Sequence, residues 1–130
     1  MATYLLDTSV IIDVLNNKRG RRDLLLDLLK QGNLLACCPI NVTEVYAGVR
    51  PKEETSTEEF LKSLEYHHIT WPVARMAGLL KRDYARKGTT LTSADTTIAA
   101  VAMINDLTLL TDNVKDFPMK ELALYPLPMV

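Results

Sequence analysis

Short hydrophobic runs alternate along this chain with longer segments in which hydrophobic residues recur every three or four positions. The short runs, at residues 4–6, 34–38, 67–71 and 107–110, have the length and composition of buried strands. The longer segments between them have the period of amphipathic helices. Alternating strands and helices predict a parallel sheet covered by helices on both faces. We therefore expect an α/β fold, a three-layer α/β/α sandwich around a central, mainly parallel sheet of four to five strands, with residues 124–125 as an edge strand.

Residues that favour helix starts and ends predict where the helices lie. Ser9 is a suitable N-cap for the first helix, and Ser56 with Glu59 has the spacing of a capping box for a later one. The second helix, which ends near Gly32, is expected to turn three leucines toward the core: Leu25, Leu28 and Leu29. Further helices are expected at about 41–48, 72–88 and 92–104, with a short helical turn at 113–117.

Composition narrows the class of protein. With 130 residues, of which 48% are hydrophobic, the chain is expected to form a single domain over residues 1–130. No hydrophobic run approaches the length that crosses a membrane, and the first residues lack the basic region of a signal peptide. Cys37 and Cys38 are neighbours on a predicted strand and should point to opposite faces, so we expect no disulfide framework and a reducing cytoplasm. A formal net charge of −1 argues against a simple electrostatic binder of nucleic acid, but not against a nuclease whose acids bind metal cations.

Four acidic residues are expected at one end of the sheet. Asp7 and Asp112 directly follow two of the predicted strands, and Glu44 and Asp95 lie near the starts of two helices. If the strands are parallel, all four carboxylates meet at the carboxyl edge, where they repel one another unless a cation neutralises them. Oxygen ligands without nearby His or Cys suit Mg²⁺ or Mn²⁺ rather than zinc. The pattern predicts a site with one metal ion or two, which activates water to hydrolyse a phosphodiester.

Each of these acids also has an ordinary structural explanation. Glu44 could form a capping box with Asn41, and Asp95 could do so with Thr92. Asp112 could be a common turn residue. The chemical interpretation is favoured because all four residues fall at one predicted end of one sheet.

The segments LLDTSVII, NVTEVYAGV, SADTTIAAVA and LLTDNVKDF, in this order, resemble the motifs of PIN domains. More narrowly, the chain is similar to the VapC toxins of bacterial and archaeal toxin–antitoxin pairs, and the similarity covers nearly its whole length. The resemblance implies a PIN-like α/β/α fold and a metal-dependent endoribonuclease that uses Mg²⁺ or Mn²⁺. It also implies a homodimer and a cognate VapB-like antitoxin whose C-terminal segment covers the active site.

Three acids match the family residue by residue, and the fourth does not. Asp7, Glu44 and Asp95 match the first three acidic positions, and Thr8 and Ser9 match the hydroxyl-bearing positions beside the first acid. The family usually places its fourth acid two residues after the threonine that ends the last main strand. The residues that compete for this position here are Asn113, which occupies it, Asp112, one residue earlier, and Asp116, three residues later.

Other enzyme classes with an α/β pattern fit the first strand less well. A HAD-type phosphatase requires a second Asp two residues after the first, and Ser9 occupies that position. A receiver domain requires paired acids after the first strand, but Thr8 follows Asp7, and no glycine-rich phosphate loop is present. The remaining alternative is a catalytically silent PIN-like module that binds a protein or RNA partner.

Two groups of side chains are expected to lie on the surface of the protein. The helices near 24–29 and 60–64 carry more hydrophobic residues than one buried stripe needs, which favours a homodimer. Three arginines at the start of the second helix are candidates for contacts with RNA phosphates, but ordinary exposed side chains are favoured there: Arg19, Arg21 and Arg22.

Overall fold

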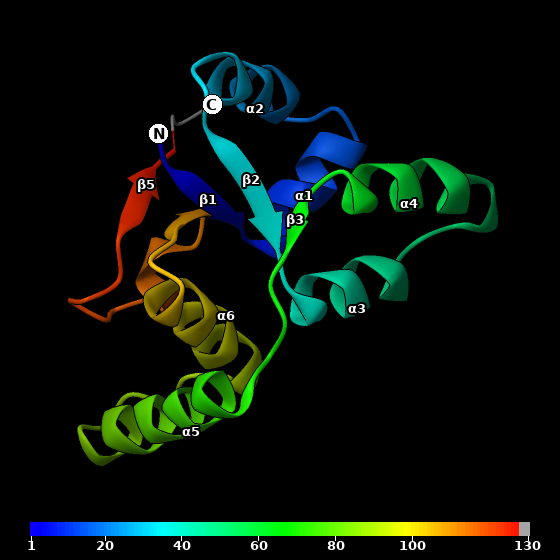
Figure 1. The fold of residues 1–130 in the computed structure, drawn as a ribbon. Coiled ribbons are helices and arrows are strands. Elements are labelled where there is room, and N and C mark those ends of the chain that lie inside the picture. The colour runs from blue at the N-terminus through cyan, green and yellow to red at the C-terminus, as the bar shows by residue number, and fades with distance from the viewer. Residues whose placement is uncertain (128–130) are drawn as a thin grey trace.

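A five-stranded, entirely parallel sheet forms the centre of the computed structural model, which describes residues 1–127 (Figure 1). The strand order is β3-β2-β1-β4-β5, so the first strand lies in the middle. The strands are β1 (Thr3–Leu6), β2 (Leu34–Cys37), β3 (Glu65–Tyr66), β4 (Thr108–Thr111) and β5 (Leu124–Pro126). The parallel α/β sandwich expected from the sequence is confirmed.

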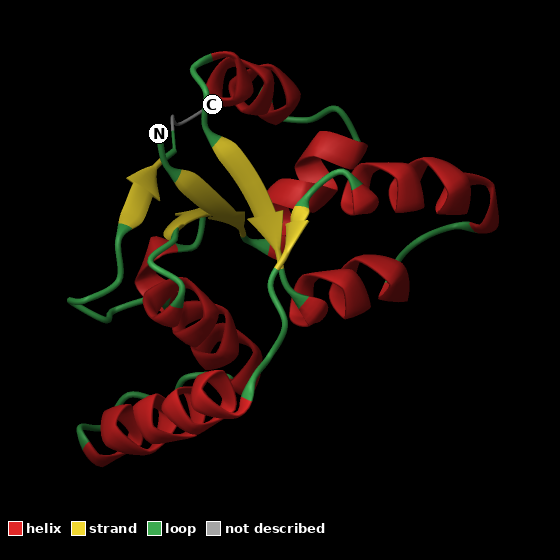
Figure 2. Ribbon diagram, viewed as in Figure 1, coloured by secondary structure: helices red, strands yellow, loops and turns green. Residues whose placement is uncertain are grey.

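Six α-helices flank this sheet (Figure 2). They are α1 (Thr8–Leu15), α2 (Arg21–Lys30), α3 (Pro39–Ala47), α4 (Glu54–Lys62), α5 (Trp71–Arg86) and α6 (Ser93–Ile104), with short 3₁₀ turns η1 (Pro51–Glu53) and η2 (Val114–Asp116). Helices α1, α2 and α4 cover one face of the sheet, and α5 and α6 cover the other (Figure 1). Within residues 1–127, no helix is both long enough and apolar enough to cross a lipid bilayer.

Side chains that alternate along each strand supply the two halves of the core. Leu5 packs with α5 and α6, and its neighbour Leu6 packs with α1, α2 and α4. Cys37 and Cys38 likewise enter opposite halves, and both are buried free thiols, as expected. Because both faces are covered, the central strands β2, β1 and β4 are continuous hydrophobic runs, which is the reason that they could be predicted.

The first helix begins two residues earlier than expected. Its N-cap is Asp7 and not Ser9, because Asp7 keeps the extended backbone of β1 (φ −69°, ψ 153°) while its carboxylate accepts a hydrogen bond from the Thr8 amide. Strand and helix therefore join without an intervening loop. This junction fixes the direction of the Asp7 side chain from both sides.

The third strand was predicted wrongly at residues 67–71. Pairing with β2 instead selects Glu65–Tyr66, and α5 already begins at Trp71 with Thr70 as its N-cap. The strand lies at the edge of the sheet with both residues exposed, so hydrophobicity does not mark it. Its position depends on long-range pairing with β2.

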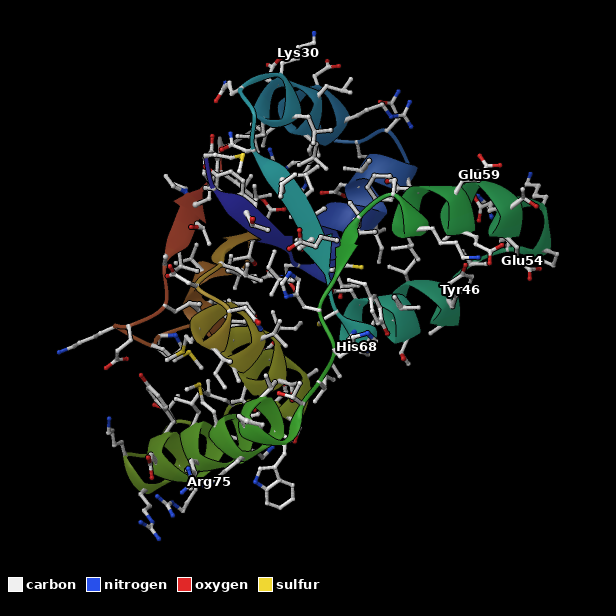
Figure 3. All side chains as sticks on the ribbon, viewed as in Figure 1. Lys30, Tyr46, Glu54, Glu59, His68 and Arg75 are labelled. Atoms are coloured by element: carbon white, nitrogen blue, oxygen red, sulfur yellow. The ribbon has the colours of Figure 1, made fainter. Side chains whose placement is uncertain are left out.

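Two further expectations, one about a helix cap and one about a buried helix face, were also wrong. The capping box before α4 joins Arg50 and Glu53, because the chain first forms η1, and Glu59 points outward from α4 (Figure 3). In α2 the buried stripe is Arg21, Leu25 and Leu28, so Leu29 lies outside it and is 46% exposed.

Candidate active site

The carboxyl edge of the sheet is centred on Asp7, at the end of the middle strand. This residue is only 6% exposed. Its carboxylate accepts a hydrogen bond from the Thr8 amide at 2.9 Å and another from the Thr111 hydroxyl, at the end of β4, at 2.6 Å. Asp7 therefore joins the two central strands at their carboxyl ends, where parallel sheets commonly bind ligands.

Burial raises the pKa of the Asp7 carboxyl above its ordinary value, and this effect outweighs the hydrogen bonds from Thr111 and Thr8, which lower it. The negative charge of Glu44 raises the Asp7 pKa further. A positive charge close to Asp7 would offset this effect and favour the charged form of its carboxylate.

Glu44 approaches Asp7 from α3 through a shared neighbour. The Thr8 hydroxyl donates a hydrogen bond to Glu44 Oε1 at 2.6 Å, while the Thr8 amide binds Asp7. Glu44 does not form the capping box that was considered for it with Asn41. Helix α3 begins at Pro39, so Asn41 itself caps the helix through the Cys38 amide, and Glu44 lies a turn further along.

Asp95 reaches the same edge from the first turn of α6. Its backbone amide donates to the Thr92 hydroxyl at 3.1 Å, so Thr92 is the helix N-cap. Partial burial raises the pKa of the Asp95 carboxyl, the Thr92 hydrogen bond lowers it, and the charges of Asp116, Asp7 and Glu44 raise it again. The helix-capping role thus uses the backbone of Asp95, while its carboxylate shares the electrostatic environment of the other acids.

Asp112 is directed toward α2 by an ion pair. Its Oδ1 atom lies 2.7 Å from Nη2 of Arg21, and its Oδ2 atom lies 3.7 Å from Nη1 of Arg19. Arg21 is only 3% exposed, so the expectation of an exposed arginine was wrong there. The alkyl part of Arg21 continues the buried stripe of α2, and Asp112 neutralises its charge.

The other two candidates for the fourth position face the acids. The Asn113 side chain hydrogen-bonds to Asp7 and lowers the pKa of that carboxyl. Asp116 contributes the largest of the charge effects that raise the Asp95 pKa. Electrostatic coupling to Asp95 therefore distinguishes Asp116 from Asp112, whose carboxylate is engaged by arginine.

The donor set has the chemistry that Mg²⁺ or Mn²⁺ requires. Asp7, Glu44 and Asp95 offer carboxylate oxygens, and burial and mutual repulsion raise the pKa of two of them, which a divalent cation would offset. Within residues 1–127, no group of three or more Asp, Glu, His or Cys side chains lies close enough together to hold a metal ion. The side chains would thus supply part of a coordination shell and leave the rest to water, as is usual for Mg²⁺.

The sequence did not assign to three residues the supporting contacts that the structure shows near these acids. Arg21 lacked a signal because its partner Asp112 lies far away in the sequence. Thr111 could have been recognised only as the polar residue that ends a hydrophobic strand. Asn41 is fully buried, and its position three residues after Cys38 was the only available clue to its capping role.

Comparison with known proteins identifies the family of this chain. The model of the PIN domain family matches residues 4–120, and the chain belongs to that family. Within it, the chain groups with the VapC ribonucleases. It is 34% identical to Ribonuclease VapC19 of Mycobacterium tuberculosis over 115 residues, which are 88% of this chain and 92% of that protein. Ribonuclease VapC10 of the same organism is 35% identical over 117 residues, covering 90% and 87% of the two chains.

Solved structures show the same fold. One is the crystal structure of VapBC2 from Rickettsia felis bound to a DNA fragment from its promoter, with a TM-score of 0.81, 27% identity and coverage of 95% of this chain and 97% of that one. Another is a toxin–antitoxin complex from Klebsiella pneumoniae, with a TM-score of 0.77, 25% identity and coverage of 92% and 95%. The PIN-like fold and the VapC resemblance expected from the motifs are confirmed.

Proposed function

We propose that this chain is an endoribonuclease, the toxin of a type II toxin–antitoxin pair, and that it depends on Mg²⁺ or Mn²⁺. Asp7, Glu44 and Asp95 would hold the cation, and the bound cation would supply a water polarised for attack on an RNA phosphodiester. The observation that carries this proposal is the convergence of the three acids at the carboxyl edge, where the charges of Glu44 and Asp7 raise the pKa of Asp95. The two relatives that match about nine-tenths of this chain at 34% and 35% identity are named as ribonucleases, which supports the proposal.

For the fourth acidic position we propose Asp116, with Asn113 beside it as a carbonyl ligand or hydrogen-bond donor. Asp112 was our first choice from the sequence, but its ion pair with the buried Arg21 already neutralises its charge. The effect of Asp116 on the pKa of Asp95 supports the later residue. Asp112 would then bind no metal ion, and its ion pair with Arg21 would stabilise the turn that follows β4.

The threonines at the site would orient the acids. Thr111 donates its proton to Asp7, and Thr8 donates to Glu44, so each carboxylate has one oxygen fixed by a hydroxyl. Each oxygen of Asp7 accepts one hydrogen bond and keeps a second lone pair for a cation. Fixed carboxylates lose little conformational freedom when they bind, which favours a defined geometry at the phosphodiester.

An antitoxin partner is supported by the solved complexes of relatives and by an apolar groove between α2 and α4. The groove has a volume of about 680 Å³ and is lined by leucines of α2, together with Phe60 and Leu64. Leu26 and Leu29 are 48% and 46% exposed there. We propose that a hydrophobic segment of a VapB-like antitoxin packs into this groove, because a concave surface fits a narrow segment better than a second copy of the rounded domain.

A homodimer and a cytoplasmic location complete the proposal. The sequence suggested a dimer through the hydrophobic residues near 24–29 and 60–64, which this proposal assigns to the antitoxin. The dimer therefore rests on exposed hydrophobic side chains outside the groove, among which Trp71 is 81% exposed. RNA as substrate and two free buried thiols fit the cytoplasm. The chain would act as one PIN domain over residues 1–130.

The proposed activity is tested with protein freed of any antitoxin. It should cut a structured RNA in millimolar Mg²⁺, and a chelator should stop the cutting. Intact RNA under both conditions, with protein whose circular dichroism shows a folded state, would favour the silent binding module.

A further inference from the structure

Asn41 is a fully buried polar residue at the start of α3, and its side chain connects three elements of the site. Its Oδ1 atom accepts a hydrogen bond from the Cys38 amide at 2.8 Å, at the end of β2. Its Nδ2 atom donates to the Thr8 hydroxyl oxygen at 3.1 Å, at the start of α1. The capping of α3 uses only the first of these contacts.

The hydrogen bond from Asn41 to Thr8 determines where the Thr8 hydroxyl proton points. Because the Cys38 amide can only donate, it determines which end of the Asn41 amide is the oxygen, and the NH₂ group must then face Thr8. A hydroxyl carries a single proton. Since the Thr8 oxygen accepts from Asn41, its proton is directed to Glu44 Oε1, 2.6 Å away.

We infer that Asn41 is a positioning residue for Glu44, acting through the Thr8 hydroxyl. The inference rests on the proposed function, in which Glu44 is a metal ligand. Glu44 has an exposed side chain on a helix surface, so without a fixed hydrogen bond it has several rotamers available. Asn41 restricts the rotamers of Glu44 through Thr8. Because Asn41 is buried in the core, its own side chain does not bind the metal ion.

The arrangement at Asp7 supports this inference independently. There the Asn113 backbone amide donates to the Thr111 hydroxyl oxygen at 2.9 Å, and Thr111 donates its proton to Asp7 Oδ2 at 2.6 Å. Glu44 and Asp7 thus each accept a hydrogen bond from a threonine hydroxyl, and the oxygen of that hydroxyl in turn accepts one from an amide N–H group. Hydrogen-bonded partners behind metal ligands commonly contribute about 10–100-fold to metal affinity.

The experiment compares Asn41→Ala with the matched control Asn33→Ala. Asn33 also accepts through Oδ1 from a backbone amide, that of Ala2 at 2.9 Å, and donates through Nδ2 to the Leu28 carbonyl at 3.1 Å. It lies before β2, at the opposite edge of the sheet. Both variants lose stability, which thermal unfolding in chelator measures. Only Asn41→Ala should also lower the affinity for Mn²⁺, by about tenfold or more in calorimetric titration without RNA.

Thr8→Val interrupts the same connection and leaves the Asn41 cap of α3 intact, so it provides the test if Asn41→Ala does not fold. It should weaken Mn²⁺ binding to a similar degree, Thr8→Ser should restore it, and Asn41→Ala should add no further loss in the Thr8→Val background. Unchanged Mn²⁺ affinity in either single variant overturns the inference while the proposed function stands. Wild-type protein that binds no Mn²⁺ overturns both.

Discussion

Removing the negative charge of Asp112 should destabilise the protein strongly, whether or not metal is present. In Asp112→Asn the side chain keeps its size, but the buried Arg21 loses the charged carboxylate that lies 2.7 Å from its Nη2 atom. Breaking one partner of a buried ion pair usually costs about 3–5 kcal/mol. The Asp112 side chain is 16% exposed and Arg21 keeps its contact with the Arg19 carbonyl, so the lower end, about 3 kcal/mol, is expected.

This free energy corresponds to a large shift in the melting temperature. An unfolding entropy of about 2.1 cal/mol/K per residue gives roughly 270 cal/mol/K for 130 residues, so about 3 kcal/mol lowers Tm by roughly 11 °C. Thermal unfolding followed by circular dichroism, in chelator and in millimolar Mg²⁺, measures both Tm and the response to metal. Asp112→Asn should melt earlier in both conditions and keep most of the Mg²⁺-induced increase.

Asp116→Asn is the matched control, because it removes one acid from the same turn. Its Tm in chelator should stay the same or rise, since it relieves repulsion with Asp95, while its response to Mg²⁺ should shrink. The reasoning is refuted if the two variants behave in the opposite way. An Asp112→Asn protein with nearly wild-type Tm in chelator and no response to Mg²⁺ would make Asp112 a metal ligand.

Further outcomes follow from the same structure. In chelator, urea unfolding should show stability falling as pH rises above about 4, because Asp7 and Asp95 have raised pKa values and the folded state therefore holds their protons more tightly than the unfolded state does. Asp7→Asn should flatten this dependence and reduce the Mg²⁺-induced increase in Tm; a pH profile identical to wild type would contradict it. Leu29→Glu should abolish binding of the antitoxin in a pull-down of the co-expressed pair, whereas Lys30→Glu, also exposed on α2 (Figure 3), should leave it intact. Light scattering of the two variants should give the wild-type dimer; a monomeric Leu29→Glu would assign the groove to the dimer instead.

The sequence predicted those features that depend on local patterns. Hydrophobic runs marked the strands because both faces of a parallel sheet are buried, and the position of Asp7 after such a run located the edge where the acids meet. Asp95 was expected at the same edge because its helix leads into β4, so in a parallel sheet the first turn of that helix lies at the carboxyl end of the strands. These inferences need no knowledge of how distant segments pair.

Features that depend on distant partners could not be predicted. The edge strand β3 has no hydrophobic pattern of its own, and it exists through pairing with β2. Arg21 is buried because Asp112, which is remote in the sequence, neutralises it, and nothing near Arg21 in the chain indicates this. The fourth acidic position stayed open for the same reason, since only the direction of side chains in the turn after β4 separates Asp112 from Asp116.

Cleavage of a structured RNA by antitoxin-free protein, with wild type and Asp95→Asn side by side in Mg²⁺, tests the central claim most directly. Asp95→Asn removes one negative charge from the acids and leaves the Thr92 cap intact, because that cap uses the backbone amide. Wild type should cut the RNA, and Asp95→Asn should bind the same RNA in a gel-shift assay without cutting it. Equal cutting by the two proteins would contradict the account, because the activity would then not depend on the acids at the carboxyl edge of the sheet.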